Sequence, residues 1–432
     1  MNKLAIIGSG TSGMFIAHGA MQAGYDVTVY SDRTAEDWLH RSAPTGTAFI
    51  YDSNIQLEKQ LGLEHWQDDA HHAHGILLDF QPTAGAPRLE VQGALESGRG
   101  AAIDIRMRVH RWMNDFEAAG GKIEYGDVTP EMLDEIAREN DLVMLAAGKG
   151  EISRIVERDP DRSVYNKPQR NLCMVLAEGI DRIAGDRSDF TPVKFNFYAD
   201  AGEYFWVPYT HKSGRHVWCV LWEAKAGGYL DKFGDVGSAQ EAVDVSREVI
   251  KEFAPYEYEY IKDMQPLEDD EFSWLKGRFP PTVRKAFGKT ASGGLVVPVG
   301  DAAILFDPIG GQGGNCAQKN SWHWVQALQK AAASGTPFTE EWATEMWESF
   351  WARHGRAAYT FNNILLEPLT DTGRTILQYA AQDRVFSDTA FFGNFHSPTN
   401  FFPWFEDKAA AEAKIAQFQR GAAGSQPVAM AS

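Results

Sequence analysis

The chain opens on Leu4-Ala5-Ile6-Ile7-Gly8-Ser9-Gly10-Thr11-Ser12-Gly13, and this stretch decides its fold. The short apolar run predicts a buried parallel strand, and the apolar spacing after it predicts a helix. Gly8 permits the tight turn between them, Gly10 lets the backbone approach a pyrophosphate, and Gly13 lets helix and strand pack closely. N–H groups at the start of the helix attract an anion. The stretch therefore predicts a Rossmann-like dinucleotide site, with Thr11 and Ser12 in the same turn.

The second strand supplies the next candidate contacts to a dinucleotide. Val27-Thr28-Val29-Tyr30 is rich in β-branched residues, and Asp32 follows it, 19 residues past the last glycine of the turn. An acid at this distance contacts the ribose, a role that Asp32 or Ser31 can take. The alternative is that Asp32 caps the next turn. Two cations complete this set of candidate binding residues: Arg33, and Arg106 at the start of a predicted helix.

A second glycine signature lies almost three hundred residues after the first. Gly300-Asp301 closes an apolar strand, so its carboxylate can hold a ribityl hydroxyl, and the glycine-rich run from Asp307 to Asn315 then opens a helix. Bare N–H groups and the positive end of that helix would stabilise the negative charge of a reduced flavin. The alternative is a glycine-rich capping loop. The candidate flavin contacts are Gly148, Asp301, Pro308, Gly311, Gln312, Gly313, Gly314 and Asn315.

The pattern of the remaining sequence predicts an α/β protein. Residues 1–150 alternate strand and helix, as in an open parallel sheet. Stretches rich in aromatic and β-branched residues then predict a second, mostly antiparallel sheet, and the chain beyond about 338 is mainly helical. The predicted parts are a discontinuous Rossmann-like FAD-binding domain (1–165 with 286–335), a substrate-binding domain (166–285), and a C-terminal helical region with a frayed tail (336–432).

The charge balance excludes several classes of partner. Lys and Arg number 41 and Asp and Glu number 59, so the formal net charge is -18. A surface this acidic repels phosphate backbones and anionic lipid, which argues against binding of nucleic acid or a membrane. The three widely spaced cysteines fit a reducing compartment, and the N-terminal apolar run is too short for a signal peptide. These features predict a cytoplasmic protein.

One histidine cluster, His71-His72-Ala73-His74, invites a metal interpretation. No cysteine or carboxylate at zinc-like spacing accompanies it. The sequence therefore predicts a solvated loop there and no metal site.

Taken together, these motifs resemble the flavoprotein monooxygenases with a hydroxybenzoate-hydroxylase-like FAD fold, and more narrowly the two-component styrene/indole monooxygenases. The resemblance covers most of the chain. The stretches that carry it are Gly8–Gly13, Val27–Arg33, Lys167-Pro168-Gln169-Arg170 and Asp307–Asn315.

The resemblance implies FAD as cofactor and molecular oxygen as co-substrate. Single-component relatives carry an Asp-Gly motif tied to FAD and NAD(P)H binding, whereas the matching stretch here, Ala147–Ser153, has none. No second Gly-x-Gly-x-x-Gly opens an NAD(P)H domain. The resemblance therefore implies that an NADH-dependent flavin reductase supplies reduced FAD, in a transient complex or by diffusion. Whether the chain forms a homodimer is left open.

The same resemblance suggests residues near the reaction centre. Thr47 and Asn315 match a Thr and an Asn that lie near it in the family, although Thr47 can also be an ordinary turn hydroxyl. Styrene-specific members show Asn-Thr-Val-Ala-His around that Thr, and indole-specific members a Ser-x-Gln-x-Met pattern. Gly46-Thr47-Ala48-Phe49-Ile50 is neither. The predicted substrate pocket comprises Ala48, Ile50, Ile76, Phe205, Trp206 and Pro308. Alternate residues of a strand face opposite sides, so at most one of Phe205 and Trp206 should face it.

The predicted function is an FAD-dependent monooxygenase of two-component type. Reduced FAD and oxygen would give a C4a-hydroperoxide that oxygenates an aromatic alkene, an indole or a sulfide in a dry, apolar pocket. One alternative is a flavin-dependent halogenase, although Glu203–Pro208 lacks the Trp-x-Trp-x-Ile-Pro pattern of that class. The other is a flavin-binding partner subunit without chemistry of its own. The sequence leaves open the natural substrate, the enantioselectivity, the reductase and the oligomeric state.

Overall fold

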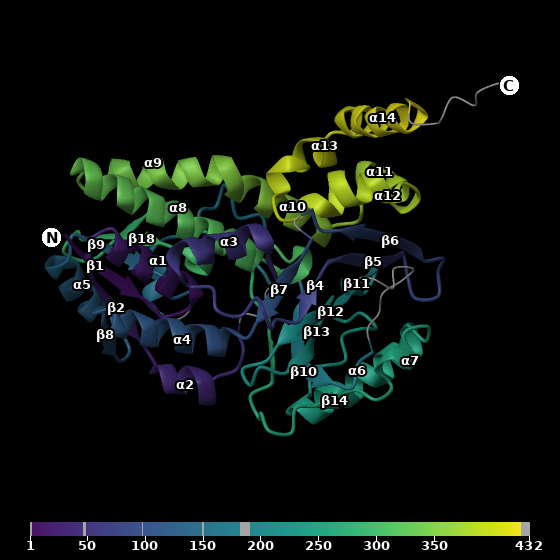
Figure 1. The fold of residues 1–432 in the computed structure, drawn as a ribbon, viewed down its shortest axis with the longest axis horizontal. Coiled ribbons are helices and arrows are strands. Elements are labelled where there is room, and N and C mark those ends of the chain that lie inside the picture. The colour runs from purple at the N-terminus through teal and green to yellow at the C-terminus, as the bar shows by residue number, and fades with distance from the viewer. Residues whose placement is uncertain (1, 46–48, 97, 149–150, 182–190, 425–432) are drawn as a thin grey trace.

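Two β-sheets lie next to each other in this computed structural model, which describes residues 2–424 apart from 46–48, 97, 149–150 and 182–190. Helices cover both sheets, and a group of C-terminal helices lies above the second one (Figure 1). Within the described residues, none of the helices combines the length and apolarity that crossing a bilayer requires. The predicted α/β architecture is confirmed.

The first sheet has six strands in the order β17-β18-β9-β1-β2-β8. All neighbours pair in parallel except β17 with β18. The bounds are β1 (Lys3–Ile7), β2 (Asp26–Ser31), β8 (Lys122–Tyr125), β9 (Leu142–Leu145), β17 (Gly288–Lys289) and β18 (Leu295–Pro298). The inner strands are apolar on both faces because helices cover both, as is typical of parallel sheets. Those helices are α1 (Thr11–Gln22), α4 (Ile105–Ala118) and α8 (Gly313–Ser334) on one face, and α5 (Pro130–Glu139) on the other.

The second sheet has eleven strands, with the central order β14-β10-β13-β12-β11-β5-β6. The bounds are β3 (Ile50–Tyr51), β4 (His72–Ala73), β5 (Gly75–Gln81), β6 (Leu89–Ala94), β7 (Gly100–Ile103), β10 (Asn171–Glu178), β11 (Pro192–Tyr198), β12 (Gly202–Thr210), β13 (His216–Ala224), β14 (Gln265–Pro266) and β15 (Trp274–Gly277). The three antiparallel strands expected from composition are β11, β12 and β13. A two-stranded ladder, β16 (Thr282–Val283) with β19 (Ile304–Leu305), stands apart.

The division of the chain between the sheets differs from the prediction in one respect. Residues 50–103, predicted inside the first domain, supply five strands of the second sheet. β5 joins it through a parallel pairing with β11, a partner more than a hundred residues away in the chain. Local composition does not report such a pairing. The chain thus crosses to the second sheet early and returns to the first through α4.

Helices cover both faces of the second sheet. α6 (Ala239–Phe253) and α7 (Tyr258–Ile261) pack on one face. The other carries α10 (Arg356–Leu366), α11 (Asp371–Gln382), α12 (Arg384–Phe386), α13 (Phe402–Glu406) and α14 (Lys408–Gly424), which Figure 1 shows above β5 and β6. The remaining helices are α2 (Ala35–His40), α3 (Asp52–Leu61) and α9 (Glu340–Phe350). The predicted tail is helical as far as α14 reaches, and its last residues, 425–432, lie outside the described part.

Candidate functional site

Both glycine signatures lie at one edge of the first sheet. β1, β9 and β18 are parallel neighbours, so the turns at their carboxyl ends meet there. A Cβ placed on Gly300 would lie 2.2 Å from Ser12 Oγ, and one on Gly8 would lie 3.0 Å from Ala146 C. Only glycine permits these approaches, since Gly8 and Gly300 also have positive φ angles of 110° and 58°. Two segments almost three hundred residues apart thus form one cradle.

The first turn of α1 is open to a ligand. Gly10 stands at the N-cap, where no side chain caps the helix, and a Cβ there would meet nothing within 4 Å. A Cβ on Gly13 would instead lie 2.0 Å from Gly8 O. Gly13 is therefore needed for packing, whereas Gly10 leaves space in front of uncapped N–H groups. An uncapped N-terminus with free space in front of it fits the pyrophosphate of FAD.

The end of β2 holds the predicted ribose contacts. Ser31 is buried, and its hydroxyl lies 2.6 Å from Ser9 Oγ and donates to Arg33 O. The Asp32 carboxylate pairs with the Arg33 guanidinium at 2.6 Å, and that guanidinium stacks over the Trp38 ring at 4.4 Å. The half-exposed Asp32 is thus held at the sheet edge beside the cradle. Its contact with a ribose stays a prediction.

Arg106 lies in a buried ion network that the sequence did not indicate. Its guanidinium pairs with Asp104 and with Asp270, each at 2.7 Å, and all three side chains are buried. Asp270 also pairs with His211 at 3.0 Å and Lys212 at 3.1 Å. Burial acts to raise the pKa of Asp270, but the His211 hydrogen bond and the Arg106 charge hold it well below its usual range. The network joins α4 to the second sheet, and a contact of Arg106 with the cofactor stays a prediction.

The glycine-rich run from Asp307 to Asn315, which we call the flavin loop, is fixed by a buried amide. Asn362 of α10 donates to Asp307 O at 2.9 Å and accepts from Gly310 N at 3.0 Å. Gly311 then takes a φ of 61°, and α8 begins at Gly313 without a side-chain cap. Its 22 residues make this a long helix with an uncapped N-terminus, which fits the electron-rich edge of a reduced flavin. The first turn of α8 and Asp301, at the adjacent edge of the sheet, are the residues that would hold the ring and the ribityl chain.

Asn315, predicted near the reaction centre, holds two backbone segments together. Its amide nitrogen donates to Phe49 O at 2.7 Å, and its oxygen accepts from Tyr51 N at 3.1 Å and from Asn54 Nδ2 at 2.9 Å. The side chain therefore fixes the start of α8 to β3 and α3. Thr47 and Ala48 lie outside the described residues. A direct role of Asn315 at the ring stays a prediction, and its contacts assign it a positioning role.

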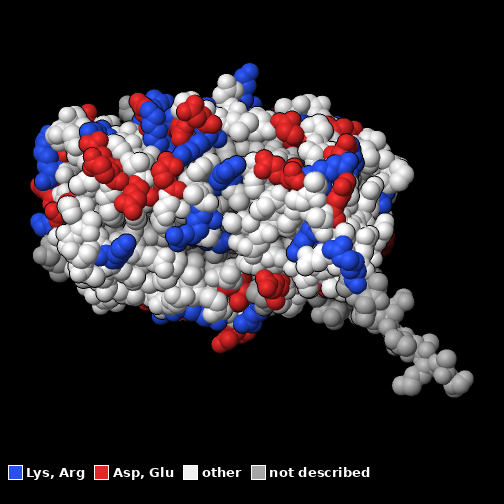
Figure 2. Space-filling model, turned by 90° about the horizontal axis from the view of Figure 1, so that it is seen from above, with Lys and Arg blue, Asp and Glu red and all other residues white. Residues whose placement is uncertain are grey.

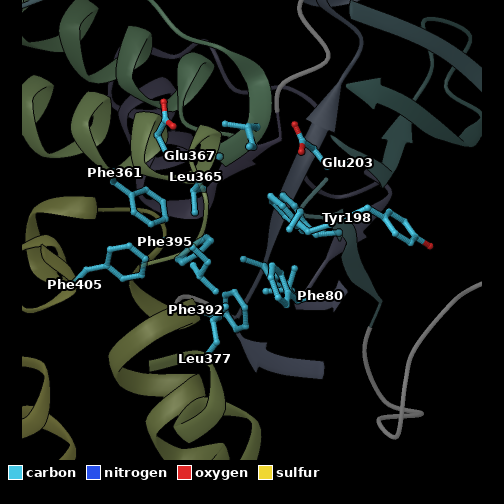
Figure 3. Close-up of a pocket in the computed structure, with 18 of the residues that line it drawn as sticks. Phe80, Tyr198, Glu203, Phe361, Leu365, Glu367, Leu377, Phe392, Phe395 and Phe405 are labelled. Atoms are coloured by element: carbon cyan, nitrogen blue, oxygen red, sulfur yellow. The ribbon is translucent and has the colours of Figure 1, made fainter. Parts of the chain in front are cut away.

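An apolar cavity of about 70 Å³ lies between the second sheet and the C-terminal helices. That volume is several times the roughly 10–15 Å³ that one water molecule requires. Figure 3 shows Phe361, Phe395 and Phe405 reaching in from the helical side and Phe80 from the sheet, with Glu203 and Glu367 at one end. The sequence-predicted Ile76 lines the cavity, as do Ile309 and Gly310 of the flavin loop. The cavity is thus aromatic, largely apolar, and adjacent to the proposed flavin site.

The other predicted pocket residues lie at different depths. Phe205 packs behind the lining ring of Phe195, with centroids 4.7 Å apart, whereas Trp206 faces α6 and donates to Glu257 at 3.3 Å. The two residues therefore face opposite sides of β12, as alternation predicts. Ile50 and Pro308 are not among the residues that line the cavity. Pro308 precedes the lining Ile309 directly.

A buried carboxyl cluster ends the cavity, and it was missed in the sequence. Arg170 Nε donates to Glu203 at 2.5 Å, and Glu203 lies directly opposite Glu223 on β13. Asp307, the first residue of the flavin loop, completes the group; all four side chains are buried. Three carboxyls thus surround one guanidinium. A possible signal was the hairpin register of β12 and β13, which pairs the two glutamates.

Burial keeps this cluster partly protonated. It raises the pKa of Glu203 to about 7 and that of Asp307 to about 6. Burial, with the charges of Asp307 and Glu203, raises the pKa of Glu223 well above its usual range. Neither Glu223 oxygen meets a donor among the described residues, and the neutral carboxyl can donate to Asp307. Burial thus favours the neutral form of Glu223, the carboxyl that faces Asp307 of the flavin loop.

We expect Glu223→Gln to stabilise the fold at pH 8 but not at pH 5. A carboxyl with a raised pKa contributes fully below its unfolded pKa of about 4.5, and that contribution is lost as the pH rises toward its folded pKa. Glutamine does not titrate, so the variant loses no stability over this range. Its free energy of unfolding should exceed that of the unchanged chain by roughly 1 kcal/mol or more at pH 8. Urea unfolding at both pH values measures it. Glu248→Gln, an exposed change on α6, is the control; equal shifts in both variants would contradict the prediction.

The histidine cluster shows backbone contacts in place of metal geometry. His71 Nδ1 lies 3.0 Å from Val217 O, and His72 Nε2 lies 2.8 Å from Gln67 O. In the part of the chain that the structure describes, no three potential ligands gather as a metal site would require. These rings are half-buried and support the edge of the second sheet.

Comparison with known proteins agrees with this geometry. Residues 148–260, which include β10 to β13, match the family model described as "Styrene monooxygenase A putative substrate binding domain". A curated protein from Pseudomonas fluorescens, named styrene monooxygenase StyA, is 26% identical over 326 residues, covering 74% of this chain and 75% of that protein. Both matches support a styrene monooxygenase-like flavoprotein.

Solved structures show the same fold at low identity. The flavin-dependent brominase Bmp2 superposes with a TM-score of 0.65 at 12% identity, covering 97% of this chain and 99% of that one. A tetrameric 2-methyl-3-hydroxypyridine-5-carboxylic acid oxygenase gives a TM-score of 0.57 at 16% identity, covering 92% and 95%. At such identities the likeness shows the architecture, which flavin-dependent oxygenases and halogenases share.

Proposed function

We propose that this chain, a styrene monooxygenase-like flavoprotein monooxygenase, is the oxygenase of a two-component system. It would take reduced FAD from a separate NADH-dependent reductase and use molecular oxygen to oxygenate a small, neutral aromatic compound. The observation that carries the proposal is the continuity of the aromatic cavity with the flavin loop, because Ile309 and Gly310 line the cavity and lead directly into Gly311 and α8.

The chain's own groups have separable roles. The N-terminus of α1 binds the pyrophosphate, Asp301 holds the ribityl chain, and the uncapped start of α8 favours the anionic, reduced form of the ring. Bound reduced flavin supplies the activation of oxygen and its transfer to substrate. Asn315 keeps Phe49 and β3 against the start of α8, beside the proposed ring site.

The cavity sets the substrate class. Phenylalanine, leucine and isoleucine side chains form most of its wall. The charged residues in the lining are Arg170, Glu203, Lys225 and Glu367, of which Arg170 and Glu203 pair with each other. An aromatic alkene, indole or aryl sulfide fits this lining, because a charged substrate buried against the apolar wall would have no partner for its charge. The walls exclude water and hold the reacting bond near the flavin loop.

The direct experiment supplies chemically reduced FAD, oxygen and substrate to the purified chain. Styrene oxide, an indole-derived blue pigment or a sulfoxide is expected without any reductase, whereas oxidised FAD alone should give no product. Formation of halogenated product in the presence of chloride or bromide would favour the halogenase alternative. Flavin binding without any oxygenated product would favour a partner subunit.

We expect Leu365→Trp to lower kcat/KM for styrene about tenfold or more. Leu365 lines the cavity from α10, so an indole there takes the space of the substrate ring. Ile364→Trp is the matched control, because the neighbouring residue has similar burial and does not line the cavity. Steady-state rates with reduced FAD in excess measure both variants. A similar loss in the control would show that helix disruption, and not cavity filling, is responsible.

A further inference from the structure

A second pocket, of about 250 Å³, lies on the outer side of α8 and shares no lining residue with the aromatic cavity. It forms where α3, α8, the turn after α9 and the segment before α13 meet. Its lining residues are Ser53, Asn54, Leu57, Lys319, Trp322, His323, Gln326, Arg353, His354, His396 and Ser397. Of these, Asn54 donates to Asn315 and so belongs to the contacts that position the proposed flavin site, and the others have no role in the proposed oxygenation.

The ionisable residues of this pocket are all basic. Lys319, His323, Arg353, His354 and His396 converge on it, although the whole chain carries a net charge of -18. Figure 2 shows Lys and Arg interspersed with Asp and Glu over the molecule's upper face, so the basic character is local. Cations gathered this closely repel one another, and a bound anion relieves that repulsion.

Counter-charges are almost absent around the pocket. In the described part of the chain, Arg353 forms no ion pair, and the Lys319 ammonium donates to the backbone oxygen of His396. The acid nearest to a member of the group is Glu96, whose carboxylate lies 3.9 Å from His396 Nε2 and is 65% exposed. Lys319 and Arg353 therefore face the pocket without an acidic partner, and burial lowers the pKa of the Lys319 ammonium to about 8.

The three histidines are arranged to respond to an anion. His323 Nε2 lies 2.9 Å from Met346 O, and His396 Nδ1 lies 3.0 Å from Gly393 O, so each ring donates to a carbonyl. Their second nitrogens donate to a ligand only when the ring is protonated. Burial lowers the pKa of all three, and that of His354 falls to about 4, with Lys319, Arg353 and His323 adding to the effect. An anion would reverse these shifts.

Hydroxyl and aromatic groups complete the lining. Ser53 Oγ is buried and has no hydrogen-bond partner among the described residues, so its hydroxyl is available to donate. Trp322 and Leu57 add apolar wall beside the cations. The pocket thus combines two cationic side chains, several N–H and O–H donors, and room for more than a bare ion.

We propose that this pocket binds a phosphate group, either as inorganic phosphate or on a small phosphate monoester. A phosphate carries close to two negative charges at neutral pH, which Lys319 and Arg353 match, and its oxygens can accept from the surrounding imidazoles and Ser53. A carboxylate has one charge and fewer oxygens, and would leave one cation unpaired.

Isothermal titration calorimetry of the full chain in low-salt, phosphate-free buffer at pH 7 tests the proposal. Inorganic phosphate and glycerol 3-phosphate are titrated separately, and the tighter one identifies the source of the group. Saturable binding at one site is expected for at least one of them, with acetate at least about tenfold weaker. No saturable binding of either phosphate, or acetate binding equally well, would overturn the proposal.

Matched variants locate the site. Arg353→Gln removes an exposed guanidinium that forms no ion pair, so folding should be unaffected, and phosphate affinity should fall about tenfold. Lys330→Gln removes an exposed charge from α8, the helix that carries Lys319, and should change affinity less than twofold. Equal affinity in Arg353→Gln and the unchanged chain would place any binding elsewhere and refute this site.

Proton linkage provides an independent readout. Sulfate keeps its double charge between pH 6 and 8, so any change in its affinity reports on the protein. We expect sulfate to bind several-fold more tightly at pH 6, with proton uptake, because His323, His354 and His396 gain charge on binding, and so does the fraction of Lys319 that is neutral near its lowered pKa of about 8. The exposed Glu96 at the rim is the acid that faces His396. Tighter sulfate binding at pH 8 would contradict the arrangement.

Discussion

Replacing Gly10 with alanine should weaken binding of reduced FAD about tenfold or more while leaving the fold intact. A Cβ at this position meets no protein atom within 4 Å, so it extends into the space in front of the α1 N-terminus. A pyrophosphate that approaches the backbone there would meet the methyl group. The φ of Gly10 is -63°, which alanine adopts readily, and the loss of a glycine N-cap costs at most about 1 kcal/mol.

The nearby substitution Gly13→Ala should have the opposite effect, lowering the stability of the fold more than the affinity for FAD. Its Cβ would lie 2.0 Å from Gly8 O, a contact that only a backbone shift can relieve. We expect the free energy of unfolding of the apoprotein to fall by about 1–3 kcal/mol or more. Fluorescence titration with reduced FAD under anaerobic conditions and urea unfolding measure both properties.

Gly234→Ala controls for the effect of an added methyl group, since its Cβ also meets nothing within 4 Å and lies far from the cradle in the chain. It should alter neither FAD affinity nor stability appreciably. If Gly10→Ala bound FAD as tightly as the unchanged chain, the proposed pyrophosphate site at α1 would be wrong. That result would also remove the basis for the flavin site at α8.

Local patterns were sufficient for the parts of the fold that depend on neighbouring residues. The glycine turn after β1 needs glycine at Gly13, because a Cβ there would lie 2.0 Å from Gly8 O in the same turn, and this local constraint is visible in the sequence. Alternation along β12 likewise placed Phe205 and Trp206 on opposite sides. In both cases a single segment carries the physical constraint.

Features that depend on distant pairings were not visible. β5 pairs with β11 across more than a hundred residues, so the sequence did not show that residues 50–103 supply strands to the second sheet. The carboxyl cluster needs three separate segments, carrying Arg170, Glu203 and Asp307, to meet at the cavity. A charged residue in an apolar strand indicates a partner, but composition does not say which residue it is.

The roles of the predicted site residues show the same limit. Asn315 stands at the expected place at the start of α8, yet its amide is bonded to Phe49 O and Tyr51 N. A motif gives the residue's position in the chain, whereas the direction of its side chain depends on the neighbours that the fold supplies. The structure therefore assigns Asn315 to positioning, a role that the sequence motif did not distinguish from contact with the ring.

Replacing Arg170 with methionine should lower the free energy of unfolding by about 3–5 kcal/mol. The Arg170 and Glu203 side chains are 4% and 2% exposed, and their pair is the only one that offsets the charge of the cluster within the described residues. Removing one partner of a buried pair leaves the other without compensation, in a region with little access to water. The loss should be largest above pH 7, where Glu203, whose folded pKa is about 7, would otherwise ionise.

The double variant Arg170→Met with Glu203→Gln separates charge from packing. If the unpaired carboxylate causes the loss, the second change should recover most of it, because the pair of neutral side chains keeps similar volume without a buried charge. Arg41→Met breaks an exposed pair with Asp37, in which Arg41 is 79% exposed, and should cost about 1 kcal/mol or less. Urea unfolding of all variants at pH 6 and 8 measures the coupling. A double variant no more stable than Arg170→Met would show that packing of the guanidinium, and not its charge, stabilises the end of the cavity.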